Sequence, residues 1–209
     1  MRRIDYKVEQ CAIVVLAAGM SSRLGSPKQL LVYNGKSLLG HTVDVALQTN
    51  NRPVVVVTGA NRSLIKKQME GTEAEIAENE GWQEGIASSL RCGLAAVQKI
   101  KPGTDGIIFM VCDQPYVTKS LLNGLLQVQQ ETGLPIVASS YEDNLGTPAL
   151  FHQSFFAELL ELGGDTGARK LINQHKELVA TVPFPEGIID IDTRADYEVL
   201  LRHKNHTAE

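Results

Sequence analysis

One stretch of the sequence, residues 13–28, restricts the possible folds of this chain more than any other. Its first four residues, Ile-Val-Val-Leu, are apolar and mostly β-branched, which predicts a buried strand of a parallel sheet. Small residues follow this strand directly, and they let backbone N–H groups approach a ligand closely. Two cations, Arg23 and Lys28, come next and suit a polyphosphate. The stretch therefore predicts a nucleoside triphosphate site at the carboxyl end of the first strand.

The two best-known glycine patterns for phosphate binding do not fit this stretch. A P-loop ends in Gly-Lys-Ser, which Gly35-Lys36-Ser37 would supply, but Leu30 stands where the pattern needs its first glycine. The dinucleotide pattern fails because Ser21 follows two places after Gly19. On spacing alone, an ordinary turn with two solvated cations remains an open alternative.

The sequence from Leu16 to Lys28, LAAGMSSRLGSPK, resembles the signature loop of the sugar-phosphate-type nucleotidyltransferases. Within them it is most similar to the molybdenum cofactor nucleotidyltransferases. The resemblance implies a Rossmann-like, three-layer α/β/α fold with a mostly parallel sheet, of the nucleotide-diphospho-sugar transferase type. It also implies Mg²⁺-dependent transfer of a nucleoside monophosphate from an NTP to a phosphate acceptor. The phosphates would lie on this loop, with Lys28 as the main charge stabiliser and Arg23 beside it.

Length and composition agree with one α/β domain. The 209 residues suit a single domain over 1–209, with a nucleotide-binding part at about 10–115 and an acceptor-binding part at about 116–195. The formal net charge of -4 argues against a general nucleic-acid binder. No apolar stretch of the sequence is long enough to span a membrane. The three cysteines are scattered and lack a CxxC pair, which favours a cytoplasmic location.

Hydrophobic patterns predict strands that alternate with helices, and therefore a parallel sheet with right-handed crossovers. The predicted further strands are 53–58, 75–79, 106–112, 135–139, 178–182 and 188–191, and 145–151 is expected to be a loop entering an edge strand. The predicted helices are 37–48, 61–69, one starting at Ser88 or Ser89, 118–131, 153–161, 167–174 and 194–203. Ligands of such sheets bind beyond the carboxyl ends of the strands. The loops 17–28, 59–61 and 113–116 are therefore expected to meet in one crevice.

Carboxylates near two strand ends are the candidate metal ligands. Asp113 ends an apolar strand, and the segment Asp113-Gln114-Pro115 is similar to the family's metal-binding Asp-x-Pro motif. The family also carries an Asp-Thr near its end, which favours Asp192 as the second ligand and Asp190 as the third. Along a strand these two aspartates would share a face. The alternative is that Asp192 or Thr193 only caps the last helix.

The nucleobase is expected to contact loops 59–61, 79–81 and 85–90. Gly85-Ile86-Ala87-Ser88-Ser89-Leu90 resembles the cytidylyltransferase branch of the family, which favours CTP over GTP. Trp82 could stack on the base. The nucleotide-binding candidates are Leu16, Ala17, Ala18, Gly19, Met20, Ser21, Arg23, Lys28, Gly59, Asn61, Asn79, Gly85, Ser88, Ser89 and Asp113.

Two later segments resemble acceptor motifs of the family. They are Gly146-Thr147-Pro148-Ala149-Leu150-Phe151 and Gly164-Asp165-Thr166-Gly167-Ala168-Arg169. The second opens a predicted helix whose N-terminus could bind an anion. The alternative is that Asp165 only caps this helix. The acceptor-binding candidates are Gln114, Gly146, Pro148, Gly164, Asp165, Gly167 and Arg169.

The resulting hypothesis is an enzyme that transfers CMP from CTP to a molybdopterin-type cofactor phosphate, with Mg²⁺ and with release of pyrophosphate. A molybdenum hydroxylase apoenzyme would be a possible partner. Two alternatives stay open. One is a transferase that uses GTP, or a sugar or polyol phosphate acceptor. The other is a non-catalytic module that only carries the cofactor.

Overall fold

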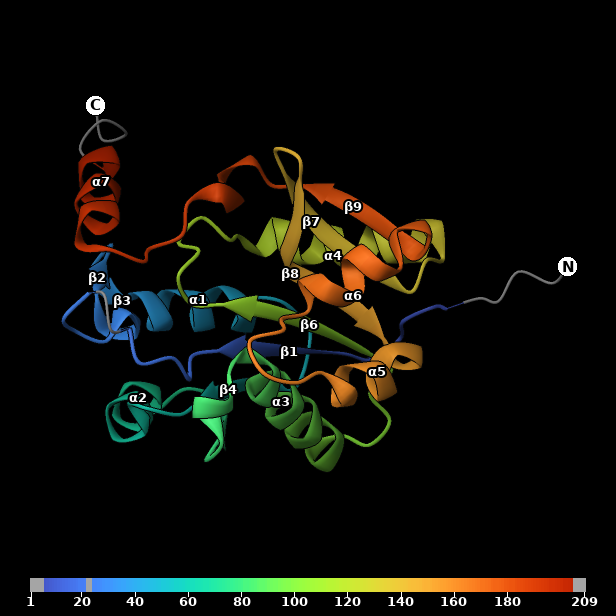
Figure 1. The fold of residues 1–209 in the computed structure, drawn as a ribbon, viewed down its shortest axis with the longest axis horizontal. Helices are drawn as coiled ribbons and strands as arrows, with labels where there is room; N and C mark the ends of the chain where they lie inside the picture. The colour runs from blue at the N-terminus through green and yellow to red at the C-terminus, as the bar shows by residue number, and fades with distance from the viewer. Residues whose placement is uncertain (1–5, 22–23, 205–209) are drawn as a thin grey trace, which may run out of the picture.

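A seven-stranded sheet forms the middle layer of the protein, and helices cover both of its faces (Figure 1). The computed structural model describes residues 6–21 and 24–204. The strand order is β5-β4-β1-β6-β8-β7-β9. The strands are β1 (Cys11–Leu16), β4 (Val54–Thr58), β5 (Glu75–Glu78), β6 (Gly106–Val111), β7 (Ile136–Tyr141), β8 (Asn144–His152) and β9 (Val179–Pro183), and β2 (Val32–Tyr33) and β3 (Lys36–Ser37) form a separate hairpin.

Most neighbouring strands run parallel, as the sequence predicts. β1 is an interior strand that pairs with β4 and β6, while β5 and β9 form the two edges. Among the seven strands found in the described residues, only β8 runs antiparallel to its neighbours, β6 and β7. Because β1, β4 and β6 run parallel, their carboxyl ends lie together at the same end of the sheet. None of the helices in the described residues combines the length and the apolar character needed to cross a membrane.

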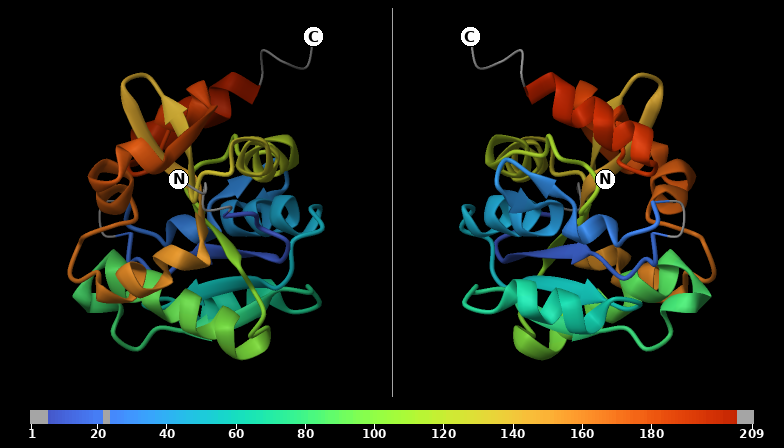
Figure 2. Two further views of the ribbon diagram at one scale, coloured as in Figure 1. Left: turned by 90° about the vertical axis from the view of Figure 1, so that its right-hand side faces the viewer. Right: turned by 90° about the vertical axis from the view of Figure 1, so that its left-hand side faces the viewer.

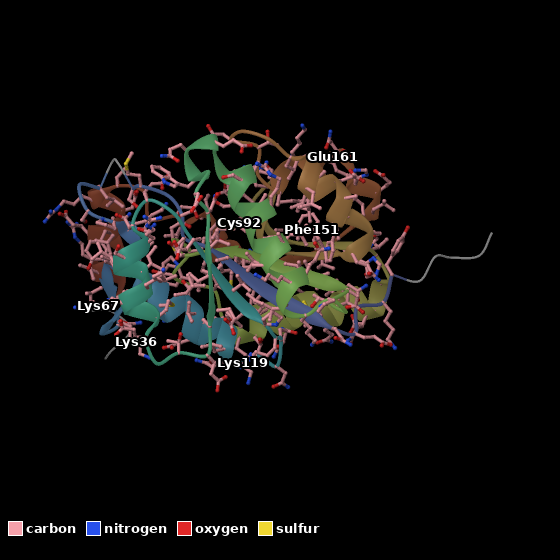
Figure 3. All side chains as sticks on the ribbon, turned by 90° about the horizontal axis from the view of Figure 1, so that it is seen from below. Lys36, Lys67, Cys92, Lys119, Phe151 and Glu161 are labelled. Carbon is pink, nitrogen blue, oxygen red and sulfur yellow. The ribbon has the colours of Figure 1, made fainter. Side chains whose placement is uncertain are left out.

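Alternating side chains of the strands build two hydrophobic cores, one on each face of the sheet. The helices α1 (Leu38–Leu47), α2 (Arg62–Met69) and α4 (Lys119–Thr132) cover one face. The helices α3 (Ile86–Ile100), α5 (Phe156–Glu161) and α6 (Arg169–Gln174) cover the other, as the views in Figure 2 show. Phe151, labelled in Figure 3, belongs to the second core, and the partly buried Cys92, labelled in the same figure, packs against it. This confirms the three-layer fold.

The expectation of an edge strand at 145–151 is wrong, because β8 is an interior strand. A proline has no N–H for the sheet ladder and usually excludes an interior strand. Here Pro148 lies where the pairing of β8 with β6 has already ended at Ala149, and where the register with β7 shifts between Ala138 and Ser139. The irregularity tolerates the missing donor.

The predicted strand at 188–191 is also absent. A 3₁₀ turn, Pro185–Ile188, and an irregular segment occupy this region. Ile191 is fully buried, but in a small separate cluster with Leu38 and Leu200 rather than in the sheet. This cluster holds the last helix, α7 (Arg194–Lys204), beside the β2–β3 hairpin (Figure 1).

Three helix starts test the capping predictions. Ser37 and Thr118 cap α1 and α4 as expected, because each hydroxyl accepts a hydrogen bond from a backbone N–H three residues later. α3 starts at Ile86, two residues before the predicted serines, and its N-cap is Gly85. The glycine is needed there because φ is 113°.

Candidate active site

The loop that follows β1 forms one wall of the candidate site. The Ala17 N–H donates to the Val57 carbonyl of β4 (2.9 Å), so the start of the loop is still tied to the sheet. The Ser21 hydroxyl accepts a hydrogen bond from the Lys28 N–H (3.0 Å) and closes the loop. Ser21 has a φ of 57°. Arg23, a predicted phosphate ligand, lies outside the described residues.

Lys28 joins two acidic residues from distant parts of the chain. Its Nζ pairs with the carboxylate of Asp113 and lies 3.0 Å from Oδ1 of Asp192. The side chains of Lys28 and Asp113 are only 18% and 15% exposed. Burial alone would lower the pKa of the Lys28 ammonium, but the attraction of Asp113 and the hydrogen bonds to both carboxylates outweigh it and raise this pKa above its ordinary value. Lys28 therefore stays charged in the neutral pH range.

Two hydrogen bonds bring the acidic segment around Asp192 to the end of β6. The Ile191 N–H donates to the Asp113 carbonyl (3.1 Å), and the Gln114 side-chain amide donates to the Gly187 carbonyl (3.1 Å). The Ile191 side chain is also fully buried, so both its backbone and its side chain hold the 187–191 segment in place. Asp192 reaches Lys28 through this arrangement and not through a strand.

Thr193, and not Asp192, caps the last helix, α7. The Thr193 N–H donates to the carboxylate of Asp196 (2.7 Å), and the Asp196 N–H donates back to the Thr193 hydroxyl (3.3 Å). This reciprocal pair is a capping box at the start of α7. The Asp192 carboxylate points instead at Lys28.

The carboxylates at this end of β6 suit a divalent cation that a substrate helps to hold. Oδ1 of Asp113 is buried and accepts no hydrogen bond from the described residues. The pKa of Asp190 is raised to about 6, mainly because burial removes water from its carboxylate. Repulsion from Asp113 is the second cause of this rise, and repulsion from Asp192 contributes less. A nearby cation would favour the ionised form of Asp190.

A complete metal cage is nevertheless not preformed. Within residues 6–21 and 24–204, no three His, Cys, Asp or Glu side chains are grouped closely enough to hold an ion. Mg²⁺ is commonly held by one or two carboxylates, several waters and substrate phosphates. The residues therefore fit an Mg²⁺ ion shared with a phosphate ligand.

The second wall of the site is the turn that leads into α3. The Asn79 side-chain amide donates to the hydroxyls of Ser88 (2.8 Å) and Ser89 (3.1 Å), and the Ser88 hydroxyl donates to the Gly85 carbonyl (2.8 Å). All three polar side chains are buried, at 5–7% exposed. The network fixes the shape of this turn from within.

The two walls enclose a pocket of about 340 Å³. It brings together ten of the predicted site residues: Leu16, Ala17, Ala18, Gly19, Met20, Lys28, Gly85, Ser89, Asp113 and Asp165. Gln29, Trp82 and Cys112 also line it. Burial, and next the charge of Asp113, raise the pKa of the Cys112 thiol to about 12, so this thiol stays protonated at neutral pH.

The structure does not bring the 59–61 loop into the same pocket. Gly59, Asn61 and Asn79 line a different pocket of about 560 Å³, and Trp82 borders both. A Cβ atom on Gly59 would lie 2.7 Å from the Trp82 Cβ and 2.8 Å from the Ala18 carbonyl oxygen. The indole therefore packs directly against the 59–61 loop at the boundary between the two pockets.

The predicted acceptor residues fall in three places. Asp165 lies in the 340 Å³ pocket next to Gly85. It does not cap α6, whose N-cap is Ala168, so the capping alternative is wrong. Gln114 lies beside Asp190 and the Thr147 hydroxyl (3.4 Å). The remaining candidates lie on β8 or around the start of α6, namely Gly146, Pro148, Gly164, Gly167 and Arg169.

Arg91 ties the 84–91 segment to the 162–165 segment. Its guanidinium donates to both carboxylate oxygens of Glu84 (2.7 and 2.6 Å) and to the Leu162 carbonyl. The Ala87 N–H donates to the Gly164 carbonyl (3.2 Å). Sequence reasoning missed both Arg91 and Gln29, because each acts on backbone carbonyls that only the folded chain brings near.

Gly85→Ala is expected to destabilise the protein and displace Asp165. The new Cβ would lie 2.5 Å from Oδ1 of Asp165 and from the Gly164 carbonyl, at a φ of 113°. We expect a loss of about 2–3 kcal/mol in the free energy of unfolding, measured in urea. Gly71→Ala is the matched control, because Gly71 has a φ of 79° but open space around it. Equal losses in the two variants would contradict the close contact.

The chain is similar to known proteins over most of its length. The family profile described as "MobA-like NTP transferase domain" matches residues 13–178. The nicotine blue oxidoreductase of Paenarthrobacter nicotinovorans is 29% identical over 189 residues, which are 86% of this chain and 91% of that protein. The crystal structure of Rv0371c from Mycobacterium tuberculosis H37Rv is 36% identical, with a TM-score of 0.78 over 93% of this chain and 99% of the other. Rv0371c has also been solved in complex with manganese.

A more distant solved structure shows how widely the fold is shared. The molybdopterin-guanine dinucleotide biosynthesis protein A of Archaeoglobus fulgidus is 18% identical, with a TM-score of 0.69 over 93% of this chain and 99% of the other. The fold is that of the nucleotide-diphospho-sugar transferases, as the sequence predicts.

Proposed function

This chain belongs to the family of MobA-like nucleotidyltransferases, and from that premise we propose that it transfers CMP from CTP to the phosphate of a molybdopterin-type cofactor. One observation carries the proposal. Lys28 of the signature loop pairs with Asp113 and Asp192. Lys28 and Asp113 line a pocket whose other wall is the cytidylyltransferase-like turn at Gly85. Cationic and acidic groups are thereby gathered where a triphosphate would lie.

In the proposed reaction, an oxygen of the acceptor phosphate forms a bond to the α-phosphorus of CTP. The bond from that phosphorus to the bridging oxygen breaks, and pyrophosphate leaves with the electron pair. Such a transfer depends mainly on in-line positioning and on stabilising charge. The N–H groups of Ala18, Gly19 and Met20 would bind phosphate oxygens, and Lys28 would stabilise the charge that develops on them. Arg23 is proposed to assist.

Mg²⁺ is the proposed metal. It would be held by Asp113 and Asp192, with Asp190 next to them, and it would neutralise phosphate charge when bound. The buried, unpartnered Oδ1 of Asp113 supports this assignment. The manganese complex of Rv0371c supports a divalent ion for that relative.

The base assignment depends on the turn at the start of α3. Gly85, Ser88 and Ser89 resemble the cytidylyltransferase branch, and Asn79 fixes both serines by hydrogen bonds. Trp82 borders the pocket, and in this proposal its indole stacks on the pyrimidine. We therefore prefer CTP to GTP.

The acceptor would approach from the part of the chain at about 116–195. The resemblance of the segments at Gly146 and Asp165 to acceptor motifs supports this direction, as does the position of Asp165 in the pocket. The Archaeoglobus fulgidus protein is described as acting in molybdopterin-guanine dinucleotide biosynthesis, which agrees with a pterin phosphate acceptor. A cytoplasmic location, with a molybdenum hydroxylase apoenzyme as recipient, completes the proposal. The free thiols Cys11, Cys92 and Cys112 fit that compartment.

Pyrophosphate release from purified protein tests the proposal. We expect release with CTP, Mg²⁺ and molybdopterin together, and none when any one of them is left out. Release with GTP but not CTP would overturn the base assignment. Release with a sugar or polyol phosphate in place of molybdopterin would overturn the acceptor assignment. Binding of molybdopterin without release from any NTP would favour the carrier alternative.

A further inference from the structure

Gln29 is a buried polar residue to which neither the sequence motif nor the proposed reaction gives a role. Its side chain is 1% exposed, and its Nε2 donates to the carbonyls of both Ala17 (2.9 Å) and Gly19 (2.8 Å). One side-chain amide thus holds two carbonyls of the signature loop. The two N–H groups of this buried amide therefore both have partners, which fixes the orientation of the side chain.

These bonds determine where the N–H groups of the loop point. In a trans peptide the C=O and the following N–H point in opposite directions. Because the Ala17 and Gly19 carbonyls face Gln29, the N–H groups of Ala18 and Met20 face away from it. The Ala18 carbonyl accepts a hydrogen bond from the Ala60 N–H (3.1 Å), which fixes the peptide unit between Ala18 and Gly19.

The three N–H groups so fixed are available to a ligand. Among the described residues, none accepts a backbone hydrogen bond from Ala18, Gly19 or Met20. All three residues line the 340 Å³ pocket, and the space that a Cβ of Gly19 would enter is open to 4 Å. Successive N–H groups held in this way form a concave site for anions.

Gln29 is also connected to Lys28. The Ser21 hydroxyl accepts from the Lys28 N–H (3.0 Å) and lies 3.5 Å from Oε1 of Gln29. Both ends of the loop are therefore held to the 28–29 segment that carries the catalytic ammonium.

We propose that Gln29 is a positioning residue for the triphosphate, and this inference rests on the proposed function of the loop. Its amide keeps the Ala17 and Gly19 carbonyls turned away from the phosphates. Without this donor the two carbonyls would have no partner, and one or both would turn and present oxygen to the phosphate oxygens. The loop would then repel the ligand that it now attracts.

The test uses two variants, Gln29→Glu and Gln29→Met, with inorganic tripolyphosphate as the probe. Calorimetry should show that both lose about 10-fold or more in affinity for tripolyphosphate, because each loses hydrogen bonds that fix charge-binding N–H groups. With substrates, KM for the NTP should rise more than kcat falls. If Gln29→Glu does not fold, Gln29→Met alone carries the test.

Gln129→Met is the matched control. Gln129 is fully buried and donates to the backbone carbonyls of Tyr6 and Leu134, far along the chain from the signature loop. It should lose thermal stability to a similar extent as Gln29→Met, but bind tripolyphosphate like the unmodified protein. Affinities of the Gln29 variants within 2-fold of the unmodified protein, or an equal loss of affinity in Gln129→Met, would overturn the proposal.

Tripolyphosphate carries no base and no transferable nucleotide, so its binding is separate from the proposed reaction. Binding that depends on Gln29, in a protein that releases no pyrophosphate, would support the inference and overturn the proposed function. Pyrophosphate release by a protein whose Gln29 variants keep the NTP affinity would overturn the inference and leave the function standing.

Discussion

Asp113→Asn is expected to lower the rate of nucleotide transfer by about 10³-fold, because several kcal/mol of metal-dependent charge stabilisation would be lost. The substitution keeps the shape of the side chain but removes its charge. Asp113 is the carboxylate that carries the buried, unpartnered oxygen and that pairs with Lys28. The measurement is the rate of pyrophosphate release at saturating CTP and molybdopterin over a range of Mg²⁺ concentrations.

Asp44→Asn is the control for this substitution. Asp44 also pairs with a lysine, Lys36, but that pair lies on a different, exposed part of the surface. The control should transfer nucleotide at nearly the unmodified rate. A rate for Asp113→Asn within about 10-fold of the unmodified rate would contradict the assignment of Asp113 to the reaction centre.

Lys28→Met is expected to lower kcat by about 10²–10³-fold, which is the usual effect of removing one fixed donor from a developing negative charge. A second result follows from the ion pairs. Lys28 neutralises Asp113 and Asp192, so its removal should strengthen the binding of Mn²⁺ in the absence of nucleotide. Both effects are measurable, the first by steady-state kinetics and the second by electron paramagnetic resonance.

Lys36→Met is the corresponding control, because Lys36 pairs with an aspartate outside the site. It should change neither kcat nor the affinity for Mn²⁺. A Lys28→Met variant that keeps its kcat would show that Lys28 only fills the space between two carboxylates and has no part in transfer.

The fold could be predicted from the sequence because the strands β1, β4 and β6 are apolar runs and two of the helices between the strands begin at residues that commonly cap helices. Ser37 and Thr118 cap their helices as expected. Errors arose where a local pattern depended on distant partners. Ile191 is buried as a strand residue would be, but its neighbours are Leu38 and Leu200 rather than another strand. Nothing in the local sequence distinguishes these two kinds of burial.

Only part of the candidate site could be predicted from the sequence. The loop at Lys28 and the carboxylate at Asp113 each follow a strand that the sequence marks clearly, so their meeting follows from the parallel sheet. Asp192 is 164 positions from Lys28, and only a family resemblance pointed to it. The role of Gln29 depends on two carbonyls in a loop that has no regular structure. Such contacts cannot be read from hydrophobic periodicity.

Anomalous diffraction from crystals grown with Mn²⁺ and a non-hydrolysable CTP analogue would locate both the metal and the triphosphate relative to Lys28, Asp113 and Asp192. We expect one Mn²⁺ peak bound by the carboxylates of Asp113 and Asp192, with the phosphates on the N–H groups of residues 18–20 and Lys28 Nζ turned toward the phosphates. Mn²⁺ and phosphates bound elsewhere, with Lys28 still paired to both aspartates, would contradict it.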